Sequence, residues 1–159
     1  MRIAGLAWFR RRAAVSAGAL VAPVVALVGW TLVMLIWAVI ARLPAMKKAG
    51  ISVATARGGR PGGLDGVLDE SAQWKMHNYI HLVEQPVLFY AICGVLALAQ
   101  AGGGFNAQLA WAYVALRIAH SLVQATSNII KYRFALFGLS TIVLMMLTAH
   151  AGFALLHAG

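Results

Sequence analysis

An uncharged stretch, residues 13–41, most constrains how this chain can fold. It contains no Asp, Glu, Lys or Arg and directly follows the basic residues Arg10, Arg11 and Arg12. A helix needs about 20 apolar residues to cross a bilayer, whereas the apolar region of a secretory signal peptide has only about 7 to 15. The stretch is therefore predicted to form a membrane-spanning helix over residues 16–43.

The composition of the whole chain also indicates a membrane protein. Hydrophobic residues make up 62% and charged residues 11% of the 159 positions, and the mean hydropathy is +0.80. The formal net charge is +9. Because the basic residues gather at the ends of apolar segments and no soluble basic domain is present, we expect contacts with lipid headgroups and no nucleic-acid binding. Cys93 is the only cysteine, which excludes an intramolecular disulfide and a cysteine-based metal cluster.

Three further segments are predicted to be helices, over residues 71–100, 106–130 and 134–157. A Gly-rich loop, residues 44–70, precedes the first of them, and only residues 131–133 separate the last two. Such short connections place consecutive helices antiparallel to one another. We therefore predict a single domain, residues 1–159, that is an all-α integral membrane protein built as a four-transmembrane-helix bundle.

The distribution of basic residues predicts the orientation in the membrane. One side of the bundle carries eight Lys and Arg residues: Arg42, Lys47, Lys48, Arg57, Arg60, Lys75, Lys131 and Arg133. The other side carries four: Arg2, Arg10, Arg11 and Arg12. Since cytoplasmic segments carry the excess of Lys and Arg, loop 44–70 is expected in the cytoplasm, and the expected location is a bacterial inner membrane.

Polar and ionisable residues interrupt the apolar pattern of the second and third predicted helices. His77, His81 and Glu84 share one helical face through their i, i+4, i+7 spacing, just before Pro86, where a bend is expected. A second polar face contains Arg117, His120, Gln124 and Asn128. Such groups either join helices, for example through a Glu84–Arg117 ion pair, or form a functional site. Their excess of cations over carboxylates predicts an anionic ligand.

These residues resemble the MAPEG family, the membrane-associated proteins in eicosanoid and glutathione metabolism that include microsomal glutathione transferases. The similarity lies in Glu84 followed by a proline and Phe89-Tyr90, in Arg117-x-x-His120, and in Arg133, over about residues 74–152. It implies a four-helix subunit and a homotrimer with glutathione bound between adjacent subunits near the cytoplasmic side. It further implies that Arg133 is catalytic, because it stabilises the glutathione thiolate.

The resemblance assigns glutathione binding, as co-substrate, to Glu84, Arg117, His120, His81 and Gln124. The chain departs from the family pattern at several of these positions. The best-known members carry Arg-Asn-x-x-Glu where this chain has Ile80, His81 and Glu84. They commonly have a tyrosine where it has Gln124, and often a serine where it has Phe134.

The function implied by the resemblance is a glutathione-dependent transferase or peroxidase acting on a lipophilic electrophile that enters from the lipid bilayer. Two alternatives remain open. One is a non-enzymatic assembly or regulatory protein on the same scaffold. The other is a metal-dependent enzyme in which His77, His81, Glu84 and His120 hold zinc or non-haem iron. The nearby arginines would repel a dication, so no metal is assigned to the site.

Overall fold

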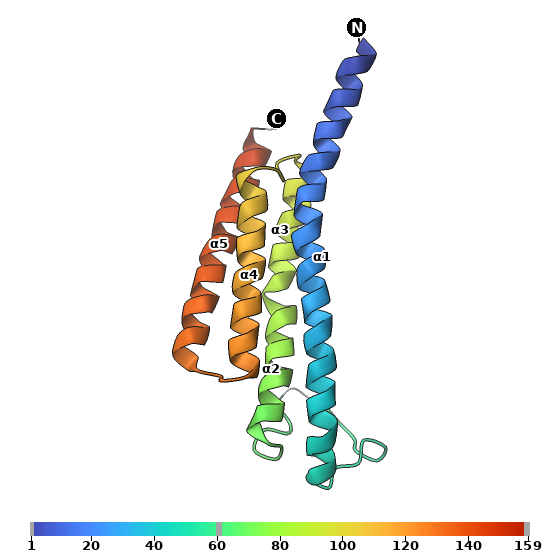
Figure 1. Ribbon diagram of the computed structural model, residues 1–159, viewed down its shortest axis with the longest axis vertical. Coiled ribbons are helices and arrows are strands. Elements are labelled where there is room, and N and C mark those ends of the chain that lie inside the picture. The colour runs from blue at the N-terminus through green and yellow to red at the C-terminus, as the bar shows by residue number, and fades with distance from the viewer. Residues whose placement is uncertain (1, 60–61, 158–159) are drawn as a thin grey trace.

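The computed structural model describes residues 2–59 and 62–157, with side chains described from residue 18 onward. In these ranges every regular element is an α-helix: α1 (Arg2–Lys48), α2 (Glu70–Glu84), α3 (Pro86–Leu98), α4 (Phe105–Ala125) and α5 (Ile130–Leu156). The helices lie side by side, and α3 continues the course of α2 along α1 (Figure 1). The prediction of an all-α fold is confirmed.

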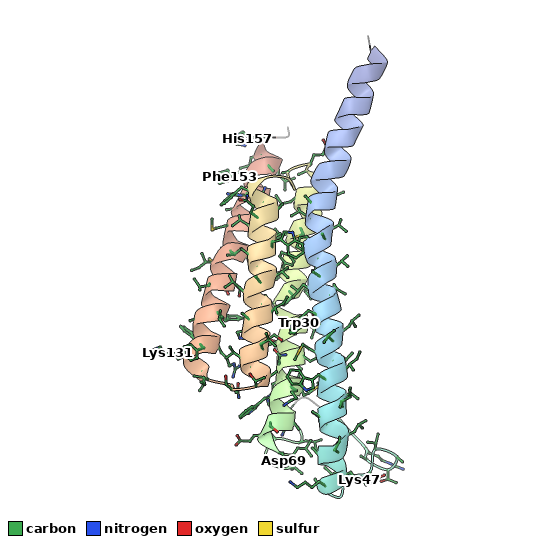
Figure 2. All side chains as sticks on the ribbon, viewed as in Figure 1. Trp30, Lys47, Asp69, Lys131, Phe153 and His157 are labelled. Carbon is green, nitrogen blue, oxygen red and sulfur yellow. The ribbon has the colours of Figure 1, made fainter. Side chains whose placement is uncertain are left out.

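Three segments have the length and hydropathy needed to cross a bilayer: residues 18–48 of α1, the α2–α3 segment over residues 70–98, and α5. Apolar side chains project outward along α1 and α5 (Figure 2). On α1 these include Val25 and Ile36, which are more than half exposed. Lipid rather than water is the solvent that suits such a surface, and the three segments support an integral membrane protein.

The first helix is longer than predicted, because it begins at Arg2 and ends at Lys48 rather than covering residues 16–43. It continues through Pro44 and ends where Gly50 adopts a positive φ of 73°. The N–H of Ile51 then donates to the carbonyl of Met46 at 2.9 Å. This backbone pattern is a common helix C-terminus that glycine favours, and it explains why the helix ends there rather than at the proline.

At Pro86, where a bend was predicted, the helix is interrupted between α2 and α3 at Gln85, which keeps helical backbone angles. Proline has no N–H to donate to the carbonyl four residues earlier, so the helix is interrupted at this point. The side chain of Gln85 spans the break, since its Nε2 donates to Thr141 Oγ1 at 2.8 Å and its Oε1 accepts from Tyr113 Oη at 3.3 Å. The interruption is therefore fixed to both α4 and α5.

The turn between the last two helices is displaced from the prediction. α4 ends at Ala125 rather than at residue 130, and α5 begins at Ile130 rather than at residue 134. The hydroxyl groups of Thr126 and Ser127 donate back to carbonyls of α4, and Asn128 has a positive φ of 53°. These polar residues compete for helical hydrogen bonds and end the helix early, so Arg133 lies inside α5 rather than before it.

Candidate functional site

Arg117 lies in the interior of the bundle, on α4. Its side chain is fully buried, and its Nη2 donates to the backbone carbonyl of His81 at 2.6 Å. The guanidinium carbon is 5.9 Å from the centroid of the Phe137 ring. Nε and Nη1 have no hydrogen-bond partner among the described residues. Because a buried cation with two unpaired donor nitrogens is unfavourable, the site favours an anionic group as their acceptor.

A pocket of about 340 Å³ lies between α2, α4 and α5, and Arg117 contacts two of its lining residues, His81 and Phe137. It is lined by His81, His120, Ile130, Arg133, Phe134 and Phe137. The guanidinium of Arg133 makes its lining cationic, and the two imidazoles add polar ring nitrogens. Ile130 and Phe134, which are 76% and 78% exposed, make its rim apolar and open to the surroundings.

The two histidines of the pocket face one another. Their ring centroids are 5.9 Å apart, and the His120 ring is also 6.1 Å from that of Phe137. His120 is 2% exposed, and its Nδ1 has no partner among the described residues. An imidazole nitrogen can donate or accept a hydrogen bond, so His120 can bind a ligand group directly.

Arg133 occupies the first turn of α5 and completes the pocket. Its Nη1 donates to Asn128 Oδ1 at 2.7 Å, whereas its Nε is buried and has no described partner. The first turn of α5 has no acidic residue, and the preceding Ile129 provides no side-chain cap. Because a helix N-terminus carries a positive partial charge, this arrangement favours a bound anion. When no anion is bound, it is unfavourable for the positive charge of Arg133.

A polar junction of three helices supports this arrangement and was not anticipated from the sequence. Ser121 Oγ accepts hydrogen bonds from Trp30 Nε1 of α1 at 3.1 Å and from Asn78 Nδ2 of α2 at 2.8 Å. The junction fixes the rotation of α4, on which Arg117 lies one turn earlier and Gln124 about one turn later. Gln124 is 2% exposed and faces the interior without lining the pocket. A single serine within an apolar helix gives no sequence signal for such a role.

The polar faces differ in two respects from the interpretations considered for the sequence. Glu84 does not pair with Arg117: its side chain is 61% exposed and lies 3.8 Å from His81 Nδ1. The face of α2 that points inward contains Asn78 and Leu82 instead. Asn128 belongs to the turn rather than to α4, because the helix ends three residues earlier.

The geometry also separates the residues of the metal alternative. His77 Nε2 lies 3.2 Å from Asp65 Oδ1 at the surface, whereas His81 and His120 line the pocket together with Arg133. Among the described side chains, no group of three or more His, Cys, Asp or Glu residues is close enough to hold one metal ion. The arrangement therefore does not support this alternative.

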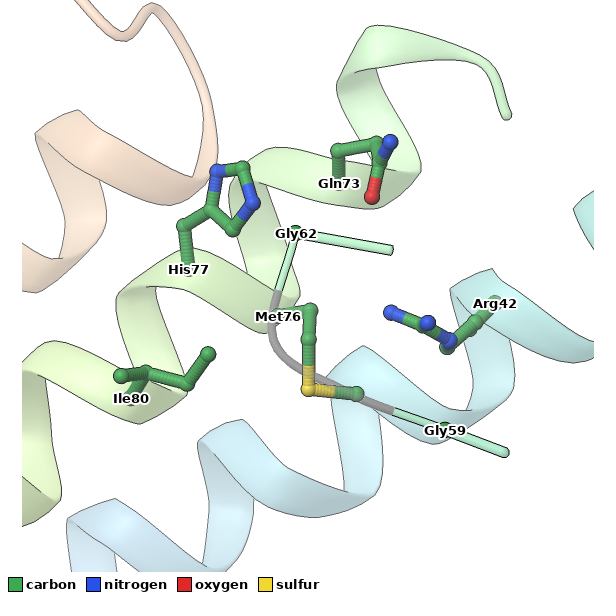
Figure 3. Close-up of a pocket in the computed structure, with 7 residues that line it drawn as sticks. All are labelled: Arg42, Gly59, Gly62, Gln73, Met76, His77 and Ile80. Carbon is green, nitrogen blue, oxygen red and sulfur yellow. The ribbon is translucent and has the colours of Figure 1, made fainter. Parts of the chain in front are cut away.

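A second pocket, of about 400 Å³, lies between the end of α1 and the start of α2. Figure 3 shows the side chains of Arg42, Gln73, Met76, His77 and Ile80 around it, together with Gly59 and Gly62 of the loop. Arg42 is only partly buried, and none of these side chains has a buried polar atom without a partner among the described residues. The smaller pocket beside Arg117 is therefore the stronger candidate.

Comparison with known protein families decides how the pocket is interpreted. A sequence profile of the MAPEG family matches residues 20–153, a range that contains every residue of the pocket. The chain belongs to the MAPEG family. Comparisons with curated proteins and with solved structures found no match. Membership makes this a membrane protein of the family associated with glutathione and eicosanoid metabolism, and it confirms the resemblance inferred from the sequence.

In this MAPEG protein the structure brings together most of the residues expected to form the site. His81, His120 and Arg133 line one pocket, and Arg117 contacts the ring of Phe137 and the backbone carbonyl of His81 beside it. Glu84 lies at its outer edge through its contact with His81. Two guanidinium groups and two imidazoles with one exposed carboxylate form a site that can bind an anion and stabilise developing negative charge.

Proposed function

We propose that this MAPEG protein is a glutathione-dependent transferase or peroxidase acting on a lipophilic electrophile. One observation carries the proposal: the buried guanidinium of Arg117 has two nitrogens without a partner and lies beside a pocket lined by Arg133. Glutathione has two carboxylates and a thiol that can ionise, so it supplies the acceptors and the negative charge that this site needs. Family membership makes glutathione the first compound to consider.

The proposed role of Arg133 is to stabilise the thiolate of glutathione. A free thiol has a pKa of about 8.5, and only its thiolate form is a good nucleophile at neutral pH. A guanidinium group in a site of low dielectric constant favours the charged form and lowers this pKa. The uncapped N-terminus of α5 acts in the same direction. Arg117 and His120 bind the carboxylates of glutathione. The side-chain amide of Gln124 lies behind them as a further binding group.

The thiolate then reacts in one of two balanced ways. In conjugation, the sulfur forms a bond to an electrophilic carbon, and the group that leaves that carbon takes the electron pair and a proton. In peroxide reduction, the sulfur attacks one peroxide oxygen and the other leaves as an alcohol after taking a proton, and a second glutathione condenses with the resulting sulfenic acid to give a disulfide and water. The apolar rim of Ile130, Phe134 and Phe137 lets a lipophilic substrate reach the sulfur from the bilayer.

The proposal includes a homotrimer of subunits with four membrane-spanning helices. α4 is packed against α1, α2 and α5, so it shares their depth although its polar residues lower its hydropathy. Glu84, which is exposed on a single subunit, would then contribute to a site between two subunits. The basic loop between α1 and α2 would face the cytoplasm.

The test is glutathione binding to the detergent-purified protein by calorimetry, with a thiolate absorbance difference spectrum. The wild type should bind glutathione and form the thiolate, and Arg133→Ala should bind more weakly and lose the thiolate signal. Lys131→Ala is a matched control, because it removes an exposed cation from the same helical turn outside the pocket. Failure of a folded wild-type protein to bind millimolar glutathione would reject this function and favour a non-enzymatic role.

A further inference from the structure

The turn that connects α4 to α5 contains a residue with two separate structural contacts, Asn128. Its backbone has a positive φ of 53°, and its N–H donates to the carbonyl of Val123 at 2.7 Å, which closes the C-terminus of α4. Asparagine and glycine are the residues that adopt this conformation most readily. The backbone of Asn128 therefore fixes where α4 ends.

The side chain of the same residue contacts Arg133, which lines the pocket. Asn128 Oδ1 accepts the hydrogen bond from Arg133 Nη1 at 2.7 Å. This contact joins the end of the helix that carries Arg117 and His120 to the first turn of the helix that carries Arg133. One residue thereby sets the position of the Arg133 guanidinium relative to the rest of the pocket.

Arg133 needs such a contact because its local surroundings oppose its charge. It lies at the positive end of α5, two residues after Lys131, in a turn without an acidic residue. Its Nε is buried and has no other described partner to hold it. A long guanidinium side chain in this position would otherwise turn toward solvent, away from the pocket.

We propose that Asn128 is a positioning residue that holds the guanidinium of Arg133 toward the pocket. The inference rests on the proposed function, in which Arg133 stabilises a thiolate. The amide is suited to this task because it is neutral. A carboxylate at the same position would hold Arg133 equally well, but its negative charge would offset the stabilisation that Arg133 gives to the thiolate.

The experiment compares Asn128→Gly, Asn128→Asp and the wild type by two measurements. Glycine keeps the positive φ and removes the acceptor, whereas aspartate keeps the acceptor and adds a charge. The first measurement is ¹⁵N NMR of arginine side chains in detergent micelles, with the Arg133 signals assigned through Arg133→Lys. The second is the apparent pKa of the bound glutathione thiol, from thiolate absorbance as a function of pH.

We expect the Arg133 guanidinium to rotate slowly in the wild type and in Asn128→Asp, and freely in Asn128→Gly. The thiol pKa should rise by about one unit in Asn128→Gly and at least as much in Asn128→Asp. The kcat should fall in parallel, with little change in the KM for glutathione. A residue needed only for the turn would change thermal stability in Asn128→Gly without moving the thiol pKa.

Each measurement can overturn the proposal by itself. If Arg133 rotates as slowly in Asn128→Gly as in the wild type, Asn128 does not hold it. If Arg133 is released and the thiol pKa does not change, holding it has no chemical role. If the wild type binds no glutathione, the proposed function fails, and the NMR comparison still decides whether Asn128 positions Arg133.

Discussion

The two halves of α4 differ sharply in what they bury. The first half places Leu109, Ala110, Tyr113 and Val114 in the interior, and the second half places Arg117, His120, Ser121 and Gln124 there. The change takes place within a single turn of one helix. Its partners change at the same level, because Phe89 of α3 stacks on Tyr113 in the first half, whereas Asn78 of α2 donates to Ser121 in the second.

The difference indicates that the first half of α4 mainly stabilises the bundle, whereas the second half belongs to the candidate site. Most buried side chains in the first half are apolar and need no hydrogen-bond partner. Phe89 stacks on Tyr113 with ring centroids 4.4 Å apart. The second half contains four buried polar atoms without a partner among the described residues, two of them on Arg117, and two more lie on the neighbouring Asn78 and Arg133. Since native proteins leave few such atoms, their concentration at one end indicates a ligand site.

Replacing Arg117 should give the largest effect on binding. Arg117→Met removes a buried cation and keeps a long apolar side chain. We expect glutathione to bind about 100-fold more weakly, which corresponds to about 3 kcal/mol of lost charge-assisted hydrogen bonds. Thermal stability without ligand should be unchanged or higher, because removing a buried charge with two unpaired nitrogens offsets the loss of its hydrogen bond to the His81 carbonyl. Calorimetry and thermal unfolding measure the two effects.

The opposite pattern would contradict the assignment of different roles to the two halves of α4. If Arg117→Met lowered stability and left glutathione binding unchanged, Arg117 would be a structural residue, like its apolar neighbours in the first half of α4.

Removing the hydroxyl of Ser121 should mainly affect stability. Ser121→Ala leaves Trp30 Nε1 and Asn78 Nδ2 without their acceptor, and we expect a loss of about 2 kcal/mol in the free energy of unfolding. Ser140→Ala is the matched control, since Ser140 is also fully buried but donates only to a carbonyl of its own helix. Unfolding in mixed detergent micelles measures both, and equal losses would show that the junction of three helices adds nothing.

The smallest effect is expected at the surface, for His77. Its contact with Asp65 is exposed on both sides, so His77→Ala should change the free energy of unfolding by no more than about 0.5 kcal/mol. Glutathione binding should be unchanged. Loss of activity in this variant would instead support a metal site that includes His77. It would contradict the assignment of the candidate site to the second half of α4 and its neighbours.

Much of the fold could be predicted because its causes are local. The uncharged run of α1 and the missing N–H of Pro86 act within a few residues, so the first span and the break after α2 were found from the sequence. The end of α4 was placed too late, because the apolar pattern continues through residues 129–130 while Thr126 and Ser127 end the helix through side-chain hydrogen bonds.

The site could be predicted only in part. Helical spacing shows which residues share a face of a helix, but not whether that face points into the bundle or away from it. His81, Glu84 and Asn78 lie on adjoining faces of α2, and only packing against α1 and α4 turns Asn78 inward and Glu84 outward. Arg117, His120 and Arg133 were found because ionisable groups stand out in an apolar helix. The roles of Ser121 and Trp30 depend on contacts between residues far apart in the sequence, which spacing does not reveal.

The central claim is that the pocket beside the second half of α4 binds glutathione as a thiolate. Proton release on binding tests this claim most directly. Calorimetry at pH 7 in two buffers of different ionisation enthalpy gives the number of protons released when glutathione binds to the wild-type protein. S-methylglutathione, which has no ionisable thiol, is the control. We predict release of nearly one proton per glutathione bound and almost none for the control. Binding of both compounds with equal proton release, or no binding, would contradict the claim.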